Sequence, residues 1–172
     1  MFKYLFLLIS LTFSNPIAVK PSADTSEVHL GKLSLVGAAV ATSFAGSYYL
    51  VLKNGWWDEQ GQDFHFENDF EYALNLDKLG HFYGGYLIAE LFRDGLQWSG
   101  VAETPSYLWA GGLSTVVQVA IDIKDGYAPS WGYSIWDVGA GALGSFFPML
   151  QRYVPGFDYL TLKFSYWKNS DA

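Results

Sequence analysis

The sequence predicts an all-α bundle of about four short apolar helices that associates with a membrane. Charged residues make up only 16% of the 172 residues, against about 25% in ordinary soluble domains. Aromatic residues reach 19%, and there are 18 glycines. Glycine allows helices to approach closely in a bilayer, and tryptophan and tyrosine favour its interfaces. The third observation is a series of four separate apolar segments, which in a chain of this length fit a single domain.

The beginning of the chain has the character of a targeting segment. Lys3 precedes a short apolar run that ends near Pro16. Such a run suits the apolar region of a signal peptide better than a spanning helix. We therefore expect residues 1–18 to be a signal peptide or N-terminal anchor, 19–32 a linker, 33–152 a helical membrane domain and 153–172 a tail.

The four apolar segments follow in order along the chain. The clearest is residues 33–52, which contains 20 residues without a charge and is just long enough to span a bilayer. The last segment is rich in glycine and alanine, which permits tight helix packing. We expect the three shorter segments either to span the membrane or to form the core helices of a membrane-attached domain. These three segments cover residues 79–92, 107–121 and 135–150.

The connections differ in character. Residues 54–77 are acidic and aromatic, which predicts a solvated loop or an interfacial helix with tryptophan anchors, and we expect His65 to be solvated there. Residues 93–105 are expected to form a turn region, and residues 122–134 a tight polar loop. Residues 159–167 alternate apolar and polar side chains, and this period of two predicts a β-strand in the tail.

A carboxylate, an ammonium and an imidazole lie within five residues at the start of the second long apolar segment. In a helix, Asp77 and His81 lie one turn apart on the same face. In an up-and-down bundle, this start and the loop between the third and fourth segments lie at the same end. We therefore expect the polar residues of both regions to gather there: Asp77, Lys78, His81, Asp122, Asp125 and Asp137.

Two kinds of chemistry fit such a cluster. Asp122 and Asp125 are spaced i, i+3, and neighbouring carboxylates raise each other's pKa and can share a proton or hold a cation. With His81 as base and Asp77 as its orienting partner, the cluster could carry out acid–base chemistry. Alternatively, the carboxylate oxygens and one imidazole could hold a metal ion. The residues identify no particular metal or cofactor.

A purely structural role for the same residues is the alternative. Asp77 and Asp137 stand where helices are expected to begin, and an aspartate there can accept backbone N–H groups as a helix cap. Lys78 can extend along apolar surface until its ammonium reaches water. Asp125 precedes a glycine, which is a common turn pair.

Charge and cysteine content exclude several classes of protein. The formal net charge of −7 argues against a nucleic-acid partner. The 172 residues contain no cysteine, which excludes disulfides, thiolate metal sites and a lipid-modified cysteine in this sequence. Membrane lipid is the expected partner, and the sequence indicates no particular protein partner.

The chain also resembles a known group over about residues 66–151. The resemblance rests on the pattern DKxxHF beginning at Asp77, the following acidic pair, the step from Trp131 to Ser134, and Asp137 at the start of a glycine-rich segment. This combination is similar to the YfiM-type family of bacterial periplasmic lipoproteins of unknown function, and more distantly to VanZ-like membrane proteins.

The resemblance implies a set of polar positions and a compartment, but no reaction. Two positions depart from the family pattern, because Asp122 stands in place of a glutamate and Gly141 in place of an asparagine or aspartate. We expect a bacterial cell-envelope membrane protein that recognises or modifies a lipid or glycan head group at the periplasmic face. The alternative is a non-catalytic membrane scaffold. The catalytic candidates are His81, Asp77, Asp122, Asp125 and Asp137, and the candidates for substrate binding are Lys78, Trp131 and Ser134.

Overall fold

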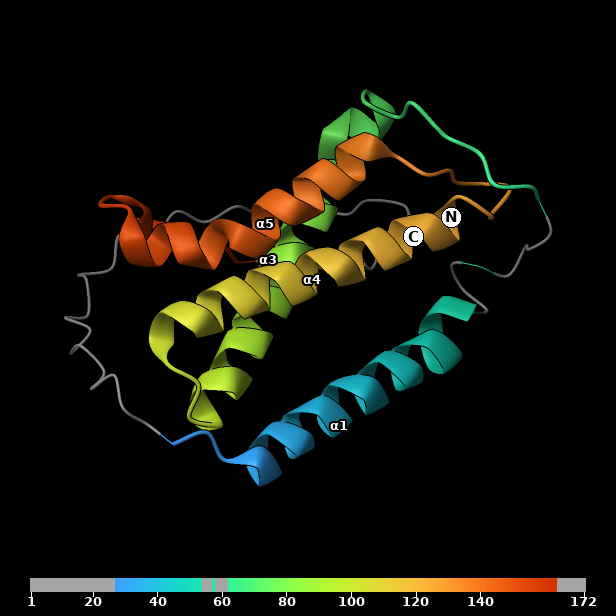
Figure 1. The fold of residues 1–172 in the computed structure, drawn as a ribbon. Helices are drawn as coiled ribbons and strands as arrows, with labels where there is room; N and C mark the ends of the chain where they lie inside the picture. The colour runs from blue at the N-terminus through green and yellow to red at the C-terminus, as the bar shows by residue number, and fades with distance from the viewer. Residues whose placement is uncertain (1–26, 54–56, 58–61, 164–172) are drawn as a thin grey trace, which may run out of the picture. The chain divides into compact units, whose positions relative to one another are not determined.

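A computed structural model describes residues 27–53, 57 and 62–163 of the chain. Helices dominate these residues, which contain no strand and one isolated β-bridge (Figure 1). The predicted all-α fold class is therefore confirmed. The elements are α1 (Leu30–Ser47), a π-helical turn (Tyr48–Leu52), a 3₁₀ turn (Tyr72–Asn75), α3 (Leu76–Trp98), α4 (Glu103–Asp125), α5 (Ile135–Tyr153) and a second 3₁₀ turn (Phe157–Tyr159).

The chain contacts separate two units, residues 21–149 and residues 150–172 together with 1–20. In the second unit, the Gln151 side-chain amide donates to the carbonyl of Leu160 at 2.5 Å. Residues 160–163 have no regular secondary structure, so the predicted tail strand is absent from the part of it that the structure describes. The rest of that strand and the predicted targeting segment lie outside the described residues.

Three helices are longer than the apolar segments that predicted them. α3 continues to Trp98, so the turn expected over residues 93–105 is wrong for most of its length, and only residues 99–102 join α3 to α4. Pro105 lies in the first turn of α4, where a missing N–H interrupts no intrahelical hydrogen bond. The first or last turns of these helices contain polar residues, so a prediction based on runs of apolar residues makes the helices too short.

Small residues form the contact between α3, α4 and α5. A methyl group added to Gly85 of α3 would lie 2.2 Å from the carbonyl oxygen of Gly141 in α5. The hydroxyl of Ser114 in α4 donates to the carbonyl of Gly85 at 2.8 Å. The helices thus approach almost to backbone contact, as small residues permit.

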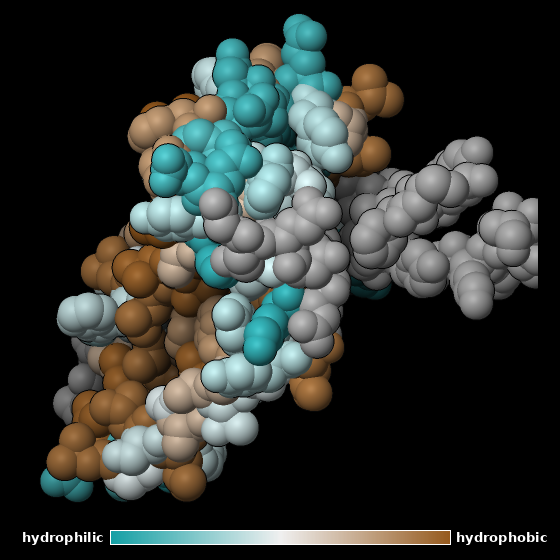
Figure 2. Space-filling view, turned by 90° about the vertical axis from the view of Figure 1, so that its right-hand side faces the viewer, coloured by the Kyte–Doolittle hydropathy of each residue, from teal (hydrophilic) through white to brown (hydrophobic). Residues whose placement is uncertain are grey.

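Large apolar side chains lie mostly on the outside of the described structure. Leu91 is 73% exposed and Leu143 67%, whereas Ser106, Ser114 and Ser145 are at most 1% exposed. Figure 2 shows hydrophobic side chains over much of the face in view, with hydrophilic side chains gathered in one part of it. Only six hydrophobic residues are buried among the described ones: Trp57, Ala89, Leu96, Ala110, Ala128 and Phe147.

α1 and the π-helical turn contain the one helix in the described residues that is long and apolar enough to cross a membrane, over Leu30–Leu50. No residue of α1 is buried. Its N-terminal end contacts the end of α3, where the backbone N–H of His29 donates to the carbonyl of Ser99 at 2.8 Å. An apolar groove of about 320 Å³ runs between the two helices, lined by residues such as Phe44 and Phe92.

Candidate functional site

A left-handed turn leads the chain into α3 and brings the charged side chains of Asp69 and Lys78 together. Asp69, which precedes the turn, pairs with Lys78 in the first helical turn, with 2.5 Å between Nζ and Oδ2. The Lys78 ammonium also donates to the backbone carbonyl of Asp69 at 2.9 Å. Three consecutive non-glycine residues adopt the positive φ angles that side chains disfavour: Ala73 (48°), Leu74 (56°) and Asn75 (62°).

Lys78 holds three carboxylates around its ammonium. Besides Asp69, its Nζ lies 3.1 Å from Asp137 Oδ1 and 3.5 Å from Asp77 Oδ2. Its side chain is only 12% exposed, so the expectation that Lys78 reaches water is wrong. Burial favours the neutral amine, but the bonds to Asp69 and Asp137 outweigh it and raise the pKa of Lys78. The Asp69 carboxylate is partly buried, yet the bonds from Lys78 and Ser134 lower its pKa.

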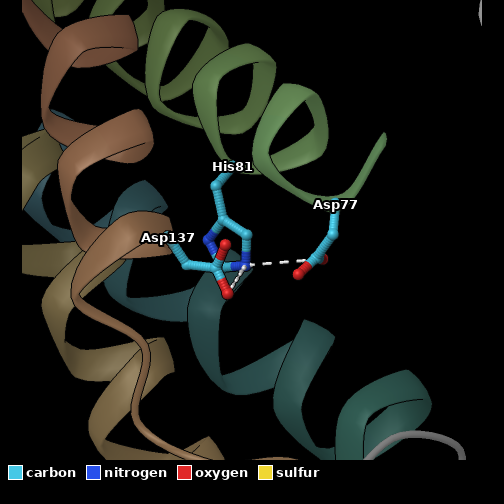
Figure 3. Close-up of side chains that lie close together, drawn as sticks. All are labelled: Asp77, His81 and Asp137. Atoms are coloured by element: carbon cyan, nitrogen blue, oxygen red, sulfur yellow. Dashed lines mark ion pairs between the residues drawn. The ribbon is translucent and has the colours of Figure 1, made fainter. Parts of the chain in front are cut away.

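His81 faces Asp77 and Asp137, as Figure 3 shows. Its Nε2 lies 3.9 Å from Asp77 Oδ1 and 3.9 Å from Asp137 Oδ2. Its Nδ1 lies 3.2 Å from the amide oxygen of Gln118. With that oxygen as acceptor, Nδ1 carries the proton and the Nε2 lone pair is directed toward the two carboxylates. The predicted placement of Asp77 and His81 on one helix face is confirmed.

Ser134, and not Asp137, caps the start of α5. The Ser134 hydroxyl accepts the backbone N–H of Asp137 at 3.3 Å and donates to Asp69 Oδ1 at 2.5 Å. The interpretation of Asp137 as a helix cap is therefore wrong, because its carboxylate projects toward Lys78 and His81. Burial, together with the nearby carboxylates of Asp69 and Asp77, raises the pKa of Asp137 to about 8. Asp77 is likewise inside the first turn of α3, and Asn75 occupies the N-cap.

The two carboxylates at the end of α4 have different surroundings. Asp122 is 1% exposed, and its Oδ1 accepts the backbone N–H of Ser134 at 3.3 Å. Its Oδ2 has no hydrogen-bond partner among the described residues, and burial raises the pKa of Asp122 to about 7. Asp125 accepts the indole N–H of Trp57 at 2.6 Å, and burial raises its pKa despite that bond.

A cavity of about 660 Å³ opens beside these residues. Its wall includes His81, Asp77, Asp125 and Asp137, so the predicted gathering of polar residues at one end of the helices is confirmed. Asp122, Lys78 and Ser134 do not line the cavity. Lys78 and Ser134 instead contact carboxylates that do, those of Asp137 and Asp69 respectively. Among the described residues, the cavity lining contains six carboxylates and no lysine or arginine: Glu67, Asp69, Glu71, Asp77, Asp125 and Asp137.

Comparison with protein families places the chain in a known group. Residues 54–153 match the model of the DUF2279 family, described as predicted periplasmic lipoproteins. The chain belongs to the DUF2279 family. This agrees with the expectation of a periplasmic lipoprotein family, whereas nothing in the comparison supports the YfiM-type assignment or the more distant likeness to VanZ-like proteins. No curated protein and no solved structure matches the chain.

The DUF2279 region includes the segment that covers the cavity, residues 62–72. The His65 backbone N–H donates to the carbonyl of Gly126 at 3.0 Å, and Phe66 forms the isolated bridge with Tyr133. The His65 ring Nε2 lies 2.6 Å from the carbonyl of Trp131, so the expectation of a solvated His65 is wrong. Trp131 itself lines the cavity beside Tyr72, at 6.4 Å between ring centroids.

Three residues of this DUF2279 site were missed in the sequence. Asp69 and Trp57 lie within residues 54–77, for which the sequence predicts a solvated loop or an interfacial helix with tryptophan anchors. Gln118 is the polar residue of an apolar segment, one turn before Asp122 on the same face of α4. That spacing was the available signal for Gln118, whereas no local pattern indicates the other two.

Proposed function

We propose that this envelope protein binds the polar head group of a lipid or glycan in the cavity, with His81 as base, oriented by Gln118 at Nδ1 and with Asp77 beside Nε2. The observation that carries the proposal is that His81 and Asp125 both line an open cavity instead of being fully occluded. Perturbed carboxylates that converge on a concave site are typical of functional sites. The periplasmic description of the family is consistent with an envelope substrate.

The charge of the cavity narrows the class of head group. Its six carboxylates outnumber the one ammonium paired with them, that of Lys78, so the cavity disfavours phosphate and favours groups that carry an amine or hydroxyls. The aromatic rings of Trp131 and Tyr72 add faces on which a sugar or an ammonium group can rest. An amine-bearing head group is therefore the class that the lining favours.

The orientation of His81 supports a role in proton transfer. Because Gln118 holds Nδ1, the Nε2 lone pair can accept a proton from a bound hydroxyl or a water molecule. The imidazolium formed in that step would be stabilised by Asp77 and Asp137, each 3.9 Å from Nε2.

We propose further that α1 attaches the protein to the membrane. The apolar helix over Leu30–Leu50 has no buried residue, and the 172 residues contain no cysteine that could carry a lipid. The exposed apolar residues of the other helices would lie against the same membrane. Ala41→Lys in the middle of α1 should release the protein from membranes in alkaline extraction, and full retention would contradict this attachment.

The head-group proposal can be tested by isothermal titration calorimetry of the full chain in detergent. We expect short-chain phosphatidylethanolamine to bind more tightly than phosphatidylglycerol, and glucosamine more tightly than N-acetylglucosamine, because only the first of each pair carries an amine. Glu71→Gln, a neutral change in the cavity lining, should reduce both preferences. Equal affinity within each pair, or no binding of any of the four compounds, would contradict the proposal.

A further inference from the structure

We propose that Asp77, His81 and Asp137 bind a divalent transition-metal ion such as Zn²⁺ at the wall of the cavity. Each residue offers one ligand atom, and these atoms lie within 4.8 Å of one another. His81 Nε2 is 3.9 Å from one oxygen of each carboxylate. With Zn²⁺ bonds of about 2.0–2.2 Å, adjacent ligand atoms are roughly 3.0–3.5 Å apart, so binding requires only a small contraction.

The positive charge of Lys78 does not occupy the same position. Lys78 lies 3.5 Å from Oδ2 of Asp77 and 3.1 Å from Oδ1 of Asp137. The oxygens that face His81 are the other two, Oδ1 of Asp77 and Oδ2 of Asp137. Each carboxylate therefore has one oxygen turned toward the ammonium and one toward the imidazole. Lys78 would orient the carboxylates from behind while a metal ion lies on the histidine side.

The burial and direction of the Asp137 carboxylate are the second observation that points to a bound cation. The residue is 5% exposed, and its carboxylate is directed at His81 (Figure 3). Its Oδ1 is paired with the Lys78 ammonium at 3.1 Å, whereas its Oδ2 faces His81 Nε2 at 3.9 Å, which is too long for a hydrogen bond. Buried carboxylates normally have their oxygens satisfied, and they are costly when they do not. A metal ion between Oδ2 and Nε2 would replace this long contact by two coordinate bonds.

Gln118 prepares His81 for the role of ligand. Metal-bound histidines commonly donate their second ring N–H to a carbonyl or carboxylate, which fixes the tautomer. Gln118 Oε1 lies 3.2 Å from Nδ1, which leaves Nε2 as the ligand atom. Gln118 is 3% exposed and is thus held firmly inside the helical contact.

The donor set and the local charge indicate which ion fits. One imidazole nitrogen with two carboxylate oxygens suits Zn²⁺ or Mn²⁺ better than Ca²⁺ or Mg²⁺, which favour oxygen alone. The carboxylates of Asp69, Asp77 and Asp137 with the ammonium of Lys78 leave two negative charges when ionised, which a divalent ion would neutralise. The remaining coordination positions would face the cavity, where a bound ion could activate water.

The experiment is equilibrium dialysis of the full chain in detergent against Zn²⁺ after treatment with a chelator. We expect one Zn²⁺ per chain, and at least a tenfold loss of affinity in His81→Gln and in Asp137→Asn. His29→Gln and Asp63→Asn are matched controls that should retain wild-type affinity, because both residues lie outside the three-residue cluster and the cavity lining. Circular dichroism of each variant verifies that it is folded.

A second measurement does not depend on any variant. In ¹⁵N NMR of the wild-type histidines, Zn²⁺ should shift the signal of His81 Nε2 while Nδ1 remains protonated. An absence of stoichiometric Zn²⁺ binding, a shift at another histidine alone, or retention of binding in folded His81→Gln would overturn the metal site.

The metal site occupies the same cavity as the proposed head-group site, and with a metal ion on Nε2 the role of base would pass from His81 to a metal-bound water. The metal site is tested without any head group. Titration of metal-free protein with short-chain phosphatidylethanolamine tests the proposed function separately. Head-group binding without Zn²⁺ binding would contradict the metal site alone, and Zn²⁺ binding without head-group binding would contradict the proposed function alone.

Discussion

Gly144 of α5 lies directly against the backbone of Phe82 in α3. A methyl group added to Gly144 would be 1.8 Å from the carbonyl oxygen of Phe82, so the two helices cannot keep this contact with any larger residue. We expect Gly144→Ala to lower the free energy of unfolding by about 1–3 kcal/mol or more. Gly139→Ala in the same helix is the control, because no atom lies within 4 Å of the added methyl. A thermal-shift assay in detergent should show a lower Tm for the first variant only.

Lys78→Met should destabilise the protein, because it leaves the ionised, partly buried carboxylate of Asp69 without its counter-charge. The side chains of Asp69 and Asp137 are only 13% and 7% exposed. Removing one partner of such a buried pair costs about 3–5 kcal/mol. Urea unfolding at pH 7 measures the loss, and Lys53→Met, at an exposed lysine, gives the baseline for removing a surface charge. The double variant Lys78→Met with Asp69→Asn should recover part of the loss, and equal effects at Lys78 and Lys53 would refute this account.

The buried Asp122 should make stability depend on pH. Burial raises its pKa from the ordinary value of 3.8 to about 7, so between these values the folded protein retains a proton that the unfolded chain releases. The free energy of unfolding should therefore fall as the pH rises from about 4 to about 7. Asp122→Asn has no carboxyl group to titrate at this position, so its free energy of unfolding should fall less between pH 4 and pH 7. Parallel slopes for both proteins in urea unfolding at several pH values would contradict the assignment to Asp122.

Relief of backbone strain should stabilise the turn before α3. Leu74 has a φ of 56° and is 90% exposed, so Leu74→Gly removes a disfavoured conformation without removing a buried side chain. We expect an unchanged or higher Tm, because the left-handed region costs a non-glycine residue about 1–2 kcal/mol. Leu91→Gly, at a 73% exposed site within α3, should instead cost about 1 kcal/mol. A fall in Tm of the same size in both variants would show that Leu74 is not strained.

The positions of the helices and the end at which their charges meet could be predicted from the sequence. Apolar segments mark the helices, and an up-and-down order brings the start of α3 and the start of α5 to one end. Lys78 and Asp137 are therefore neighbours although they are far apart in the chain. The ends of the helices were predicted less well, because polar residues such as Glu103 continue a helix without continuing its apolar face.

The partners of the charged residues could not be predicted in the same way. Asp69 reaches Lys78 only because the chain makes a left-handed turn, and the residues of that turn include no glycine that would indicate it. Trp57 reaches Asp125 across 68 residues, in a contact that no local pattern specifies. Asp125 lines the cavity and Asp122 does not. Their i, i+3 spacing in the sequence does not indicate which of the two carboxylates faces the cavity.

The interior of glycine and serine has a consequence for how the protein responds to temperature. The heat capacity change of unfolding comes mainly from newly hydrated apolar surface. With only six hydrophobic residues buried in the described structure, unfolding would hydrate little additional apolar surface. The stability curve should accordingly be shallow, with weak curvature between cold and heat. Growth temperature would then alter the folded fraction of this protein less than it alters that of an ordinary soluble domain of the same length.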